Sequence, residues 1–296
     1  MPIAARSRPR WCWNRPRPGR EIPPARRLPA LANEAPAPAA CNDPDMRILV
    51  TGAAAGLAAG VALALARDGH DLTITHRPGG TDPSGTLALI AAAGAAARAE
   101  PVEFLGDAGT VGAALERVVR VGGPFDALVH AVGPMTVKRF ERCTLSDYHD
   151  MLDGNLRSAV QAAAAVLPAM RASGFGRIVF FGMNGSETSQ PACGLSLHAA
   201  AKSALVSFAR TLALEEGRRG ITVNVVEPGD IRQKSLTRGA ARNQTAGNPR
   251  GRPGTWEDVA DAIRFFVNGD HDFVNGAVLR VTGGATEAYE RNATAP

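Results

Sequence analysis

Short apolar runs alternate with longer amphipathic segments from residue 46 almost to the end of the chain. Seven runs are rich in Val, Ile, Leu and Ala and have the length of buried strands. Strands that alternate with helices usually pair in parallel, so the pattern predicts an α/β fold: a doubly wound sheet of about seven mostly parallel strands, with helices on both faces. The predicted strands are Arg47–Thr51, Leu72–Thr75, Ala99–Phe104, Ala127–Ala131, Arg177–Phe181, Ile221–Val226 and Ala277–Val281. Apolar helical stripes are predicted at Leu57, Val61 and Leu65, and at Val111, Leu115 and Val118.

The first 45 residues lack this pattern and hold 10 of the 21 prolines, eight arginines, no lysine and four acidic residues. Such a segment buries too little apolar surface to offset the entropy of ordering it, so we expect a disordered extension, with a single domain over residues 46–296. Three interpretations are open: a basic interaction tail, a transit peptide, or an upstream extension of a chain whose folded part starts at Met46. One serine and no threonine fit a transit peptide poorly, and the strand that starts directly after Met46 favours the third.

Composition narrows the function classes. The chain has 296 residues, of which 45% are hydrophobic and 21% charged, with a mean hydropathy of −0.07, as is typical of a globular protein. The net charge is +5, but residues 1–45 carry +4 of it, so the nearly neutral remainder argues against a nucleic-acid partner. No run approaches the roughly 18 apolar residues of a membrane-spanning helix, and we expect no membrane partner.

Cysteine usage argues against disulfides and metals. The four cysteines stand at positions 12, 41, 143 and 193, with no CxxC pair and no histidine at ligand spacing. Neither a disulfide framework nor a structural metal site is therefore expected. A reducing compartment follows, and we expect a cytoplasmic protein.

A small-residue loop, TGAAAGLA at 51–58, follows the first strand and leads into a helix. Small residues let the backbone turn tightly against a phosphate, and the helix presents free N–H groups to it. The alternative is an ordinary strand-to-helix turn, but the position after the first strand of a parallel sheet favours a Rossmann-type dinucleotide site. The residues predicted to hold the cofactor here are Gly52, Ala54, Ala55, Gly56 and Leu57.

The end of the second strand predicts which dinucleotide binds. An acidic residue here would bond the ribose 2′-hydroxyl, whereas a basic residue suits a 2′-phosphate. No acid occurs before Asp82, and the guanidinium of Arg77 matches phosphate oxygens. We therefore predict NADP(H) rather than NAD(H), the alternative being that Arg77 is a solvated loop residue.

Together these segments resemble the short-chain dehydrogenase/reductase superfamily, in its classical branch of 3-oxoacyl-carrier-protein-reductase-like enzymes. The loop at 51–58 is similar to the family's TGxxxGxG, with Ala58 in place of the last glycine. LVHAVG is similar to LVNNAG with both asparagines replaced, and Asn155 matches the family's helix asparagine. The resemblance covers residues 46–285, and its segments are Thr51–Ala58, Leu128–Gly133, Leu152–Val160, Gly220–Ile231, Trp256–Ala260 and Gly276–Gly284.

The resemblance implies a site in which NADPH delivers hydride to a carbonyl carbon. The family's tyrosine protonates the alkoxide, a serine positions the carbonyl, a lysine assists the tyrosine and holds the ribose, and an asparagine fixes a water. Further cofactor-binding residues are implied at Ala131, Gly133, Lys202, Pro228, Gly229 and Ile231.

The departures fall on the catalytic positions. The family's YxxxK appears as HAAAK, so Lys202 is present and His198 replaces the tyrosine. Strand register places the serine position at Met183, and spacing from His198 places it at Gly185 or Ser186. We predict His198, Lys202, Asn155 and Ser186 as the catalytic set, with His198 as the proton donor. Lys202 lies one helical turn from His198 and would keep the imidazole neutral, which makes a poor acid. The alternative is a polar residue that fills the space of a lost tyrosine.

Two functions are compatible with this site. The first is an NADPH-dependent reductase of a ketone or an acyl thioester of the 3-oxoacyl type. The second is a catalytically impaired homologue that serves as an NADP(H)-binding sensor or scaffold. The resemblance also implies a homodimer or homotetramer, formed through helices near 144–173 and 197–217 and the C-terminal strand.

The segment after the Pro-Gly loop is the expected substrate lid. Its six cations are expected to receive a phosphopantetheine, an acyl-carrier protein or the cofactor's own phosphates, unless the loop is only solvated. Gln233 stands where the family often has a threonine that contacts the nicotinamide amide. The six cations are Arg232, Lys234, Arg238, Arg242, Arg250 and Arg252.

Overall fold

The computed structural model describes residues 46–231 and 234–286. The predictions for the N-terminal extension, Arg232 and Gln233 lie outside the described residues.

Seven strands form one sheet in the order β3-β2-β1-β4-β5-β6-β7, and every recorded pairing is parallel. The predicted fold class is confirmed. The order reverses between β1 and β4, and in sheets of this kind ligands bind outside the carboxyl ends of the strands at that point. The strands are β1 (Arg47–Thr51), β2 (Asp71–His76), β3 (Ala97–Pro101), β4 (Ala127–His130), β5 (Gly176–Phe181), β6 (Ile221–Pro228) and β7 (Val278–Val281).

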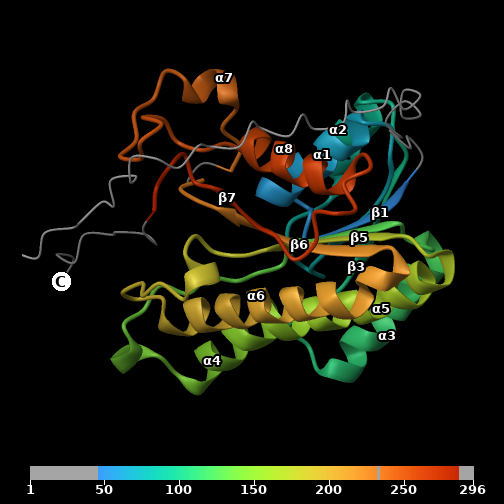
Figure 1. Ribbon diagram of the computed structural model, residues 1–296, viewed down its shortest axis with the longest axis horizontal. Coiled ribbons are helices and arrows are strands. Elements are labelled where there is room, and N and C mark those ends of the chain that lie inside the picture. The colour runs from blue at the N-terminus through green and yellow to red at the C-terminus, as the bar shows by residue number, and fades with distance from the viewer. Residues whose placement is uncertain (1–45, 232–233, 287–296) are drawn as a thin grey trace, which may run out of the picture. The chain divides into compact units, whose positions relative to one another are not determined.

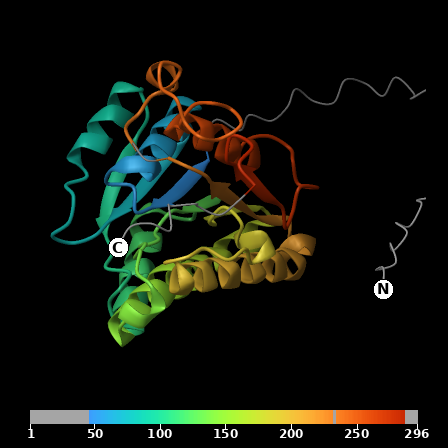
Figure 2. The same cartoon turned by 90° about the vertical axis from the view of Figure 1, so that its left-hand side faces the viewer.

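Helices cover both faces of the sheet, and two apolar clusters record the two layers (Figures 1 and 2). One cluster packs α1 (Gly56–Arg67), α2 (Ser84–Ala92) and α8 (Trp256–Val267) against the sheet. The other packs α3 (Ala108–Gly122), α5 (Ser158–Ser173) and α6 (Ser196–Glu216) against the opposite face. The predicted stripes lie in these layers, since all of their members are buried except the half-buried Leu57.

Shorter elements complete the chain and bring functional residues to the sheet edge. A π-helical turn, η2, separates α4 from α5 and carries the asparagine singled out in the sequence; such turns are frequent at functional sites. These elements are η1 (Phe140–Arg142), α4 (Leu145–Leu152), η2 (Asp153–Arg157), η3 (Ser186–Thr188), η4 (Gly217–Arg219) and α7 (Arg238–Ala241).

The third strand differs from its predicted bounds. It ends at Pro101, whereas the apolar run suggested that it continues to Phe104. After Pro101, Val102 N–H still donates to the His76 carbonyl, but the chain then turns, with Gly106 N–H donating to Glu103. Phe104 lies in this turn and its side chain is buried, so it is apolar because it packs in the core and not because it belongs to the strand.

Candidate active site

The loop between β1 and α1 has the geometry of a phosphate cradle. Gly52 and Gly56 both have φ +70°, a conformation that side chains with a Cβ rarely adopt. Helix α1 begins at Gly56 with no side-chain cap and no acid in its first turn. Its first N–H groups and the positive end of its dipole therefore face the loop with no side-chain cap among the described residues, which suits an anion.

The cradle is fixed by its neighbours. Gly52 N–H donates to Thr75 Oγ1 at 3.1 Å, and Ala53 N–H donates to the Thr75 carbonyl at 3.0 Å. From the other side Thr86 Oγ1 donates to the Ala54 carbonyl at 2.9 Å. A Cβ on Gly56 would come within 3.2 Å of Lys234 Cδ, so this cation of the expected lid lies over the phosphate loop.

Arg77 follows β2 directly and is exposed. Among the described residues it has no ion-pair partner, so its guanidinium is available to a ligand beside the loop. This is the position that the sequence assigned to recognition of a 2′-phosphate.

Asn155 lies in η2 and is fully buried. Its amide nitrogen donates to the Pro134 carbonyl at 3.0 Å and to the Met151 carbonyl at 2.9 Å. Its Oδ1 is buried and has no hydrogen-bond partner in the described part of the chain. A Cβ on Gly133 would lie 2.8 Å from this oxygen and 3.0 Å from Lys202 Nζ, so Gly133 leaves the space at which both polar groups point. An unsatisfied buried acceptor is costly, and a ligand or water in that space would satisfy it.

Lys202 reaches the same space from α6. Its Nζ donates to the Phe181 carbonyl, at the carboxyl end of β5, at 2.6 Å. The side chain is buried, and burial lowers the pKa of its ammonium to about 8. The group is therefore still mainly charged at neutral pH and is placed to bind an anionic or hydroxyl-bearing ligand.

His198 stands one helical turn before Lys202. Its Nδ1 lies 3.1 Å from the Pro134 carbonyl oxygen, so that oxygen joins His198 and Asn155. Burial is the main cause that lowers the pKa of His198 to about 4, and the Lys202 charge lowers it further. The neutral imidazole expected from the sequence is therefore the form present at neutral pH.

The candidates for the family's serine position, Met183, Gly185 and Ser186, contact each other and Glu227. Met183 is the second residue after β5, and its N–H donates to Ser186 Oγ at 3.2 Å. The Ser186 hydroxyl donates to Glu227 at 2.6 Å and is buried. Glu227 also accepts from the N–H groups of Gly185 and Glu187. In this conformation Ser186 anchors the loop at 183–190 to β6, and its hydroxyl is engaged away from the space shared by Asn155 and Lys202.

The remaining predicted residues lie along the same sheet edge. Ala131 N–H donates to Thr51 Oγ1 at 3.1 Å, which joins the ends of β4 and β1. Pro228 ends β6, and Gly229 N–H donates to the Val281 carbonyl at 2.9 Å. Ile231 N–H then donates to Gly229, which turns the chain over the edge. The structure therefore joins Asn155 to His198 through the Pro134 carbonyl and to Lys202 at Gly133, next to the phosphate loop.

Comparison with known proteins agrees with this geometry. A family model described as "Enoyl-(Acyl carrier protein) reductase" matches residues 52–286. YtkK of Bacillus subtilis is 39% identical over 181 residues, which cover 58% of this chain and 68% of YtkK. The 3-oxoacyl-[acyl-carrier-protein] reductase FabG of Escherichia coli is 31% identical over 80% of this chain and 95% of FabG. A short chain dehydrogenase from Burkholderia cenocepacia, solved in complex with NADP, is 33% identical, with a TM-score of 0.69 over 81% of this chain and 97% of that one.

The chain belongs to the short-chain dehydrogenase/reductase superfamily. Its relatives place it among the classical, 3-oxoacyl-reductase-like members, and it is an oxidoreductase of that type. In this short-chain dehydrogenase/reductase, no helix within the described ranges is long and apolar enough to cross a bilayer.

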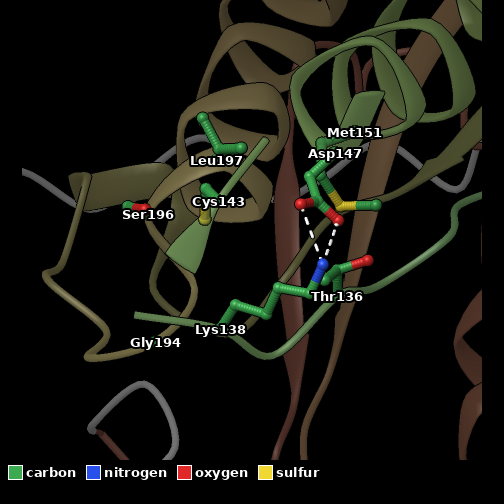
Figure 3. Close-up of a pocket in the computed structure, with 8 residues that line it drawn as sticks. All are labelled: Thr136, Lys138, Cys143, Asp147, Met151, Gly194, Ser196 and Leu197. Carbon is green, nitrogen blue, oxygen red and sulfur yellow. Dashed lines mark hydrogen bonds and ion pairs between the residues drawn. The ribbon is translucent and has the colours of Figure 1, made fainter. Parts of the chain in front are cut away.

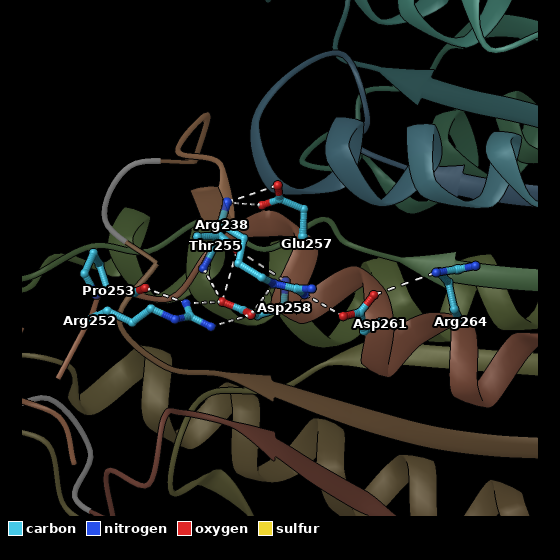
Figure 4. Close-up of polar contacts among 8 residues, drawn as sticks. All are labelled: Arg238, Arg252, Pro253, Thr255, Glu257, Asp258, Asp261 and Arg264. Carbon is cyan, nitrogen blue, oxygen red and sulfur yellow. Dashed lines mark hydrogen bonds and ion pairs between the residues drawn. The ribbon is translucent and has the colours of Figure 1, made fainter. Parts of the chain in front are cut away.

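In this short-chain dehydrogenase/reductase, the segment that the sequence suggested as a lid is tied to α8 by ion pairs (Figure 4). Arg252 binds both carboxylate oxygens of Asp258, at 2.7 and 2.8 Å. Arg238 contacts Asp258 at 3.1 Å and Asp261 at 2.5 Å. Burial alone would raise the pKa of Asp258, but hydrogen bonds from Arg252 and Thr255 outweigh it and lower the pKa to about 2. Two of the six cations, Arg238 and Arg252, are therefore engaged within the protein and hold this segment against α8.

Two cavities lie beside the predicted site. The smaller, of about 10 Å³, has room for one water and is closed by the ion pair of Lys138 with Asp147, at 2.7 Å (Figure 3). The larger, of about 280 Å³, lies between the lid and the end of β7 and is lined by polar and charged residues. Its lining residues are Asp230, Asn248, Arg250, Arg252, Gly254, Asp258, Asp261, Val281, Thr282 and Gly283.

Sequence reasoning missed three residues around the site. Pro134 acts through its backbone carbonyl, which no side-chain pattern encodes. Glu227 was read only as part of the Pro-Gly motif, although a carboxylate in an apolar strand run is a signal of a buried polar contact. His130, in place of a family asparagine, is buried between Thr51 Oγ1 at 2.9 Å and Ser158 Oγ at 3.0 Å.

The His130 contacts define a complete hydrogen-bond chain. Ser158 donates its hydroxyl proton to the Gly154 carbonyl, so it accepts from His130 Nε2–H. The bare Nδ1 then accepts from the Thr51 hydroxyl. Because burial lowers the pKa of His130 to about 3, the imidazole is neutral, as this chain requires. Strand β1 is thereby joined to the π-helical turn that carries Asn155.

Proposed function

We propose that this protein is an NADP(H)-dependent oxidoreductase that reduces a carbonyl substrate, a ketone or a 3-oxoacyl-type thioester, with alcohol oxidation as the reverse reaction. The observation that carries the proposal is the convergence of Asn155, Lys202 and His198 beside an uncapped, glycine-lined helix N-terminus. The orphaned Asn155 Oδ1 and the space left by Gly133 fit a bound nicotinamide nucleotide.

The chain's residues would divide the work. The loop at 52–57 and Lys234 would bind the pyrophosphate, Arg77 a 2′-phosphate, and Lys202 the nicotinamide ribose. When bound, the dinucleotide supplies the hydride, and the protein supplies orientation and proton transfer. The Burkholderia relative, solved with NADP, supports the choice of dinucleotide.

Calorimetry and turnover test the proposal together. We expect heat of binding with NADPH, weaker binding with NADH, and loss of NADPH absorbance with members of a panel of ketones and 3-oxoacyl thioesters. Absence of binding with either nucleotide would contradict the dinucleotide site itself.

A second candidate function is an NADP(H)-binding sensor or scaffold without catalysis. It is favoured by Met183 at the serine position and by the engagement of Ser186 with Glu227. The variant His198→Tyr distinguishes the reductase from the sensor. A gain in carbonyl reduction would indicate a pocket that lacks only a suitable proton donor. An inactive His198→Tyr variant that still binds NADPH favours the sensor.

Partners and location belong to the same proposal. The free thiols of Cys143 and Cys193 suit a reducing compartment, and we infer a cytoplasmic protein with a small-molecule substrate and no nucleic-acid partner. We infer a homodimer or homotetramer, supported by exposed apolar side chains. Among these, Leu214 and Phe273 lie near the hydrogen bond that joins Asn275 to the Ala213 carbonyl.

A further inference from the structure

The larger cavity lies outside the predicted dinucleotide and catalytic residues, none of which lines it. Two of its walls are the segment at 248–254 and the end of β7, and main-chain hydrogen bonds hold them in place. Arg250 N–H donates to the Gly283 carbonyl at 2.9 Å, and Gly254 N–H donates to the Asp230 carbonyl at 3.2 Å. The volume of about 280 Å³ is close to the lower end of the range for ligand pockets, about 300–1,000 Å³, so the cavity suits a small molecule.

The wall that α8 contributes to the cavity carries charges that are already paired. Asp258 accepts two hydrogen bonds from Arg252. Arg238 forms ion pairs with Asp258 and with Asp261 (Figure 4). Because these groups neutralise one another, they fix the shape of the cavity, and the chemistry of a ligand is set by the other walls.

Arg250, by contrast, carries a charge that no described residue neutralises. Its side chain lines the cavity and is exposed. Its guanidinium makes no ion pair or hydrogen bond within residues 46–231 and 234–286, although its main chain is fixed by the bond to Gly283. A guanidinium binds a carboxylate through two parallel hydrogen bonds. Arg250 therefore favours a ligand that carries a carboxylate.

Two uncharged side chains of the cavity have polar atoms without a partner. Thr282 is only 9% exposed, and its hydroxyl makes no hydrogen bond in the described part of the chain. Asn248 donates its amide N–H to the Arg252 carbonyl at 2.8 Å, while its Oδ1 is buried and unpaired among the described residues. A Cβ on Gly283 would lie 3.0 Å from this oxygen, so the glycine leaves space beside it. Buried polar groups in folded proteins are nearly always hydrogen-bonded, so this pair favours a ligand with hydroxyl groups.

We propose that this cavity binds a small hydroxylated carboxylate, such as a sugar acid. The carboxylate pairs with Arg250, and the hydroxyl groups donate to Asn248 Oδ1 and exchange hydrogen bonds with Thr282. A carboxylate without hydroxyls leaves both polar groups unsatisfied, and a neutral polyol leaves Arg250 without a counter-charge. Because Asp230 also lines the cavity, a doubly charged phosphate is disfavoured relative to a singly charged carboxylate. The site goes beyond the proposed function and requires no turnover.

Four probes test the class of ligand on the full chain without nucleotide. L-threonate carries a carboxylate and hydroxyl groups. Butyrate, of the same length, keeps only the carboxylate, erythritol keeps only the hydroxyls, and inorganic phosphate is an anion of higher charge. Ligand-observed NMR titration should give L-threonate a Kd at least about tenfold lower than the other three, or roughly 1.4 kcal/mol. Equal affinity for any of the other probes would overturn the inference, as would the absence of L-threonate binding.

Variants test whether the acid binds in this cavity. Arg250→Gln removes the charge and should raise the Kd of L-threonate about tenfold or more. Thr282→Val keeps the shape of the side chain, removes the hydroxyl and should raise the Kd about threefold to tenfold. The matched control is Arg242→Gln, an exposed arginine of the expected lid that does not line the cavity, and it should leave the Kd unchanged. An equal loss in Arg242→Gln would indicate general charge attraction and would overturn the inference.

The outcomes separate this site from the proposed function. If L-threonate binds and neither dinucleotide does, the cavity site stands and the proposed function fails; the reverse result overturns the cavity site alone. Competitive displacement of L-threonate by NADPH would locate the acid in the dinucleotide site and would also overturn the inference. Because Arg250 is exposed, Arg250→Gln keeps the test decisive even if Thr282→Val does not fold.

Discussion

Lys202 acts on its neighbours through charge as well as through its bond to Phe181. It lowers the pKa of His198, and burial lowers its own pKa to about 8. Lys202→Met removes the charge and keeps an apolar chain. We expect the pKa of His198 to rise and NADP(H) affinity to fall about tenfold, or roughly 1.4 kcal/mol. NMR titration and calorimetry measure the two effects, and an unchanged His198 pKa would contradict the electrostatic coupling.

Arg77 is expected to select the phosphorylated dinucleotide. Its exposed guanidinium follows β2 and has no ion-pair partner in the described part of the chain. Arg77→Ala should weaken NADPH binding by about tenfold and leave NADH binding unchanged, because only NADPH carries the 2′-phosphate. Calorimetry with both nucleotides checks this, with Arg67→Ala, an exposed arginine at the end of α1, as the control. Equal losses for both nucleotides would show that Arg77 does not read the phosphate.

The sequence predicted part of this site and missed the rest for a physical reason. Asn155, His198 and Lys202 were found because side chains at fixed spacings carry the family resemblance. The point that joins Asn155 to His198 was not found, because it is the main-chain oxygen of Pro134. Ser186 stays a prediction as a catalytic residue, and the structure shows why spacing alone is a weak guide: its hydroxyl is drawn to Glu227.

At the scale of elements, the loop at 183–190 depends on one carboxylate. Glu227 is fully buried and accepts from Gly185 N–H, Ser186 Oγ and Glu187 N–H. Glu227→Gln replaces one acceptor oxygen by a donor, so we expect a loss of about 1–3 kcal/mol in the free energy of unfolding. Urea denaturation should show a lower midpoint at an unchanged slope. Glu215→Gln, an exposed change on α6, should be neutral.

The junction of the lid with α8 should be sensitive to acid. The pKa of Asp258 is about 2 in the folded protein, below its ordinary value of 3.8. A lowered pKa adds stability that is complete above about pH 4 and is lost as the pH falls toward 2. Asp258→Asn should therefore be less stable at pH 6 and should lose less between pH 4 and pH 2. Urea unfolding at these pH values tests this, and an identical acid slope in both proteins would contradict it.

Element bounds show the same limit of sequence reasoning. β1 was predicted with its observed bounds, because polar residues flank its apolar run on both sides. β3 was predicted to extend past Pro101, since apolar residues that pack from a turn look like strand residues in a single sequence. The π-helical turn η2 was not foreseen either, because the apolar pattern does not distinguish it from α-helix; its Gly154 lies so close to Pro134 that a Cβ there would collide with the proline ring.

At the scale of the whole molecule, surface apolar residues predict self-association. Leu214 and Phe273 are 85% and 101% exposed, and both flank the contact between Asn275 and Ala213. Light scattering should give the mass of a dimer or tetramer. The double change Leu214→Asp and Phe273→Asp should lower that mass, because charge opposes burial in an interface. Leu89→Asp, an exposed site on α2, serves as the control, and a monomeric parent would contradict the prediction.

The Pro134 carbonyl accepts hydrogen bonds from both Asn155 and His198, and this affects which residues position 198 can tolerate. If His198 is exchanged for tyrosine or phenylalanine, Asn155 still donates to that oxygen, so no buried acceptor is left without a partner. The exchange therefore avoids the free-energy cost of leaving a buried acceptor without a hydrogen bond. The fold can therefore carry either a phenol or an imidazole at position 198 and still hold Asn155 in place.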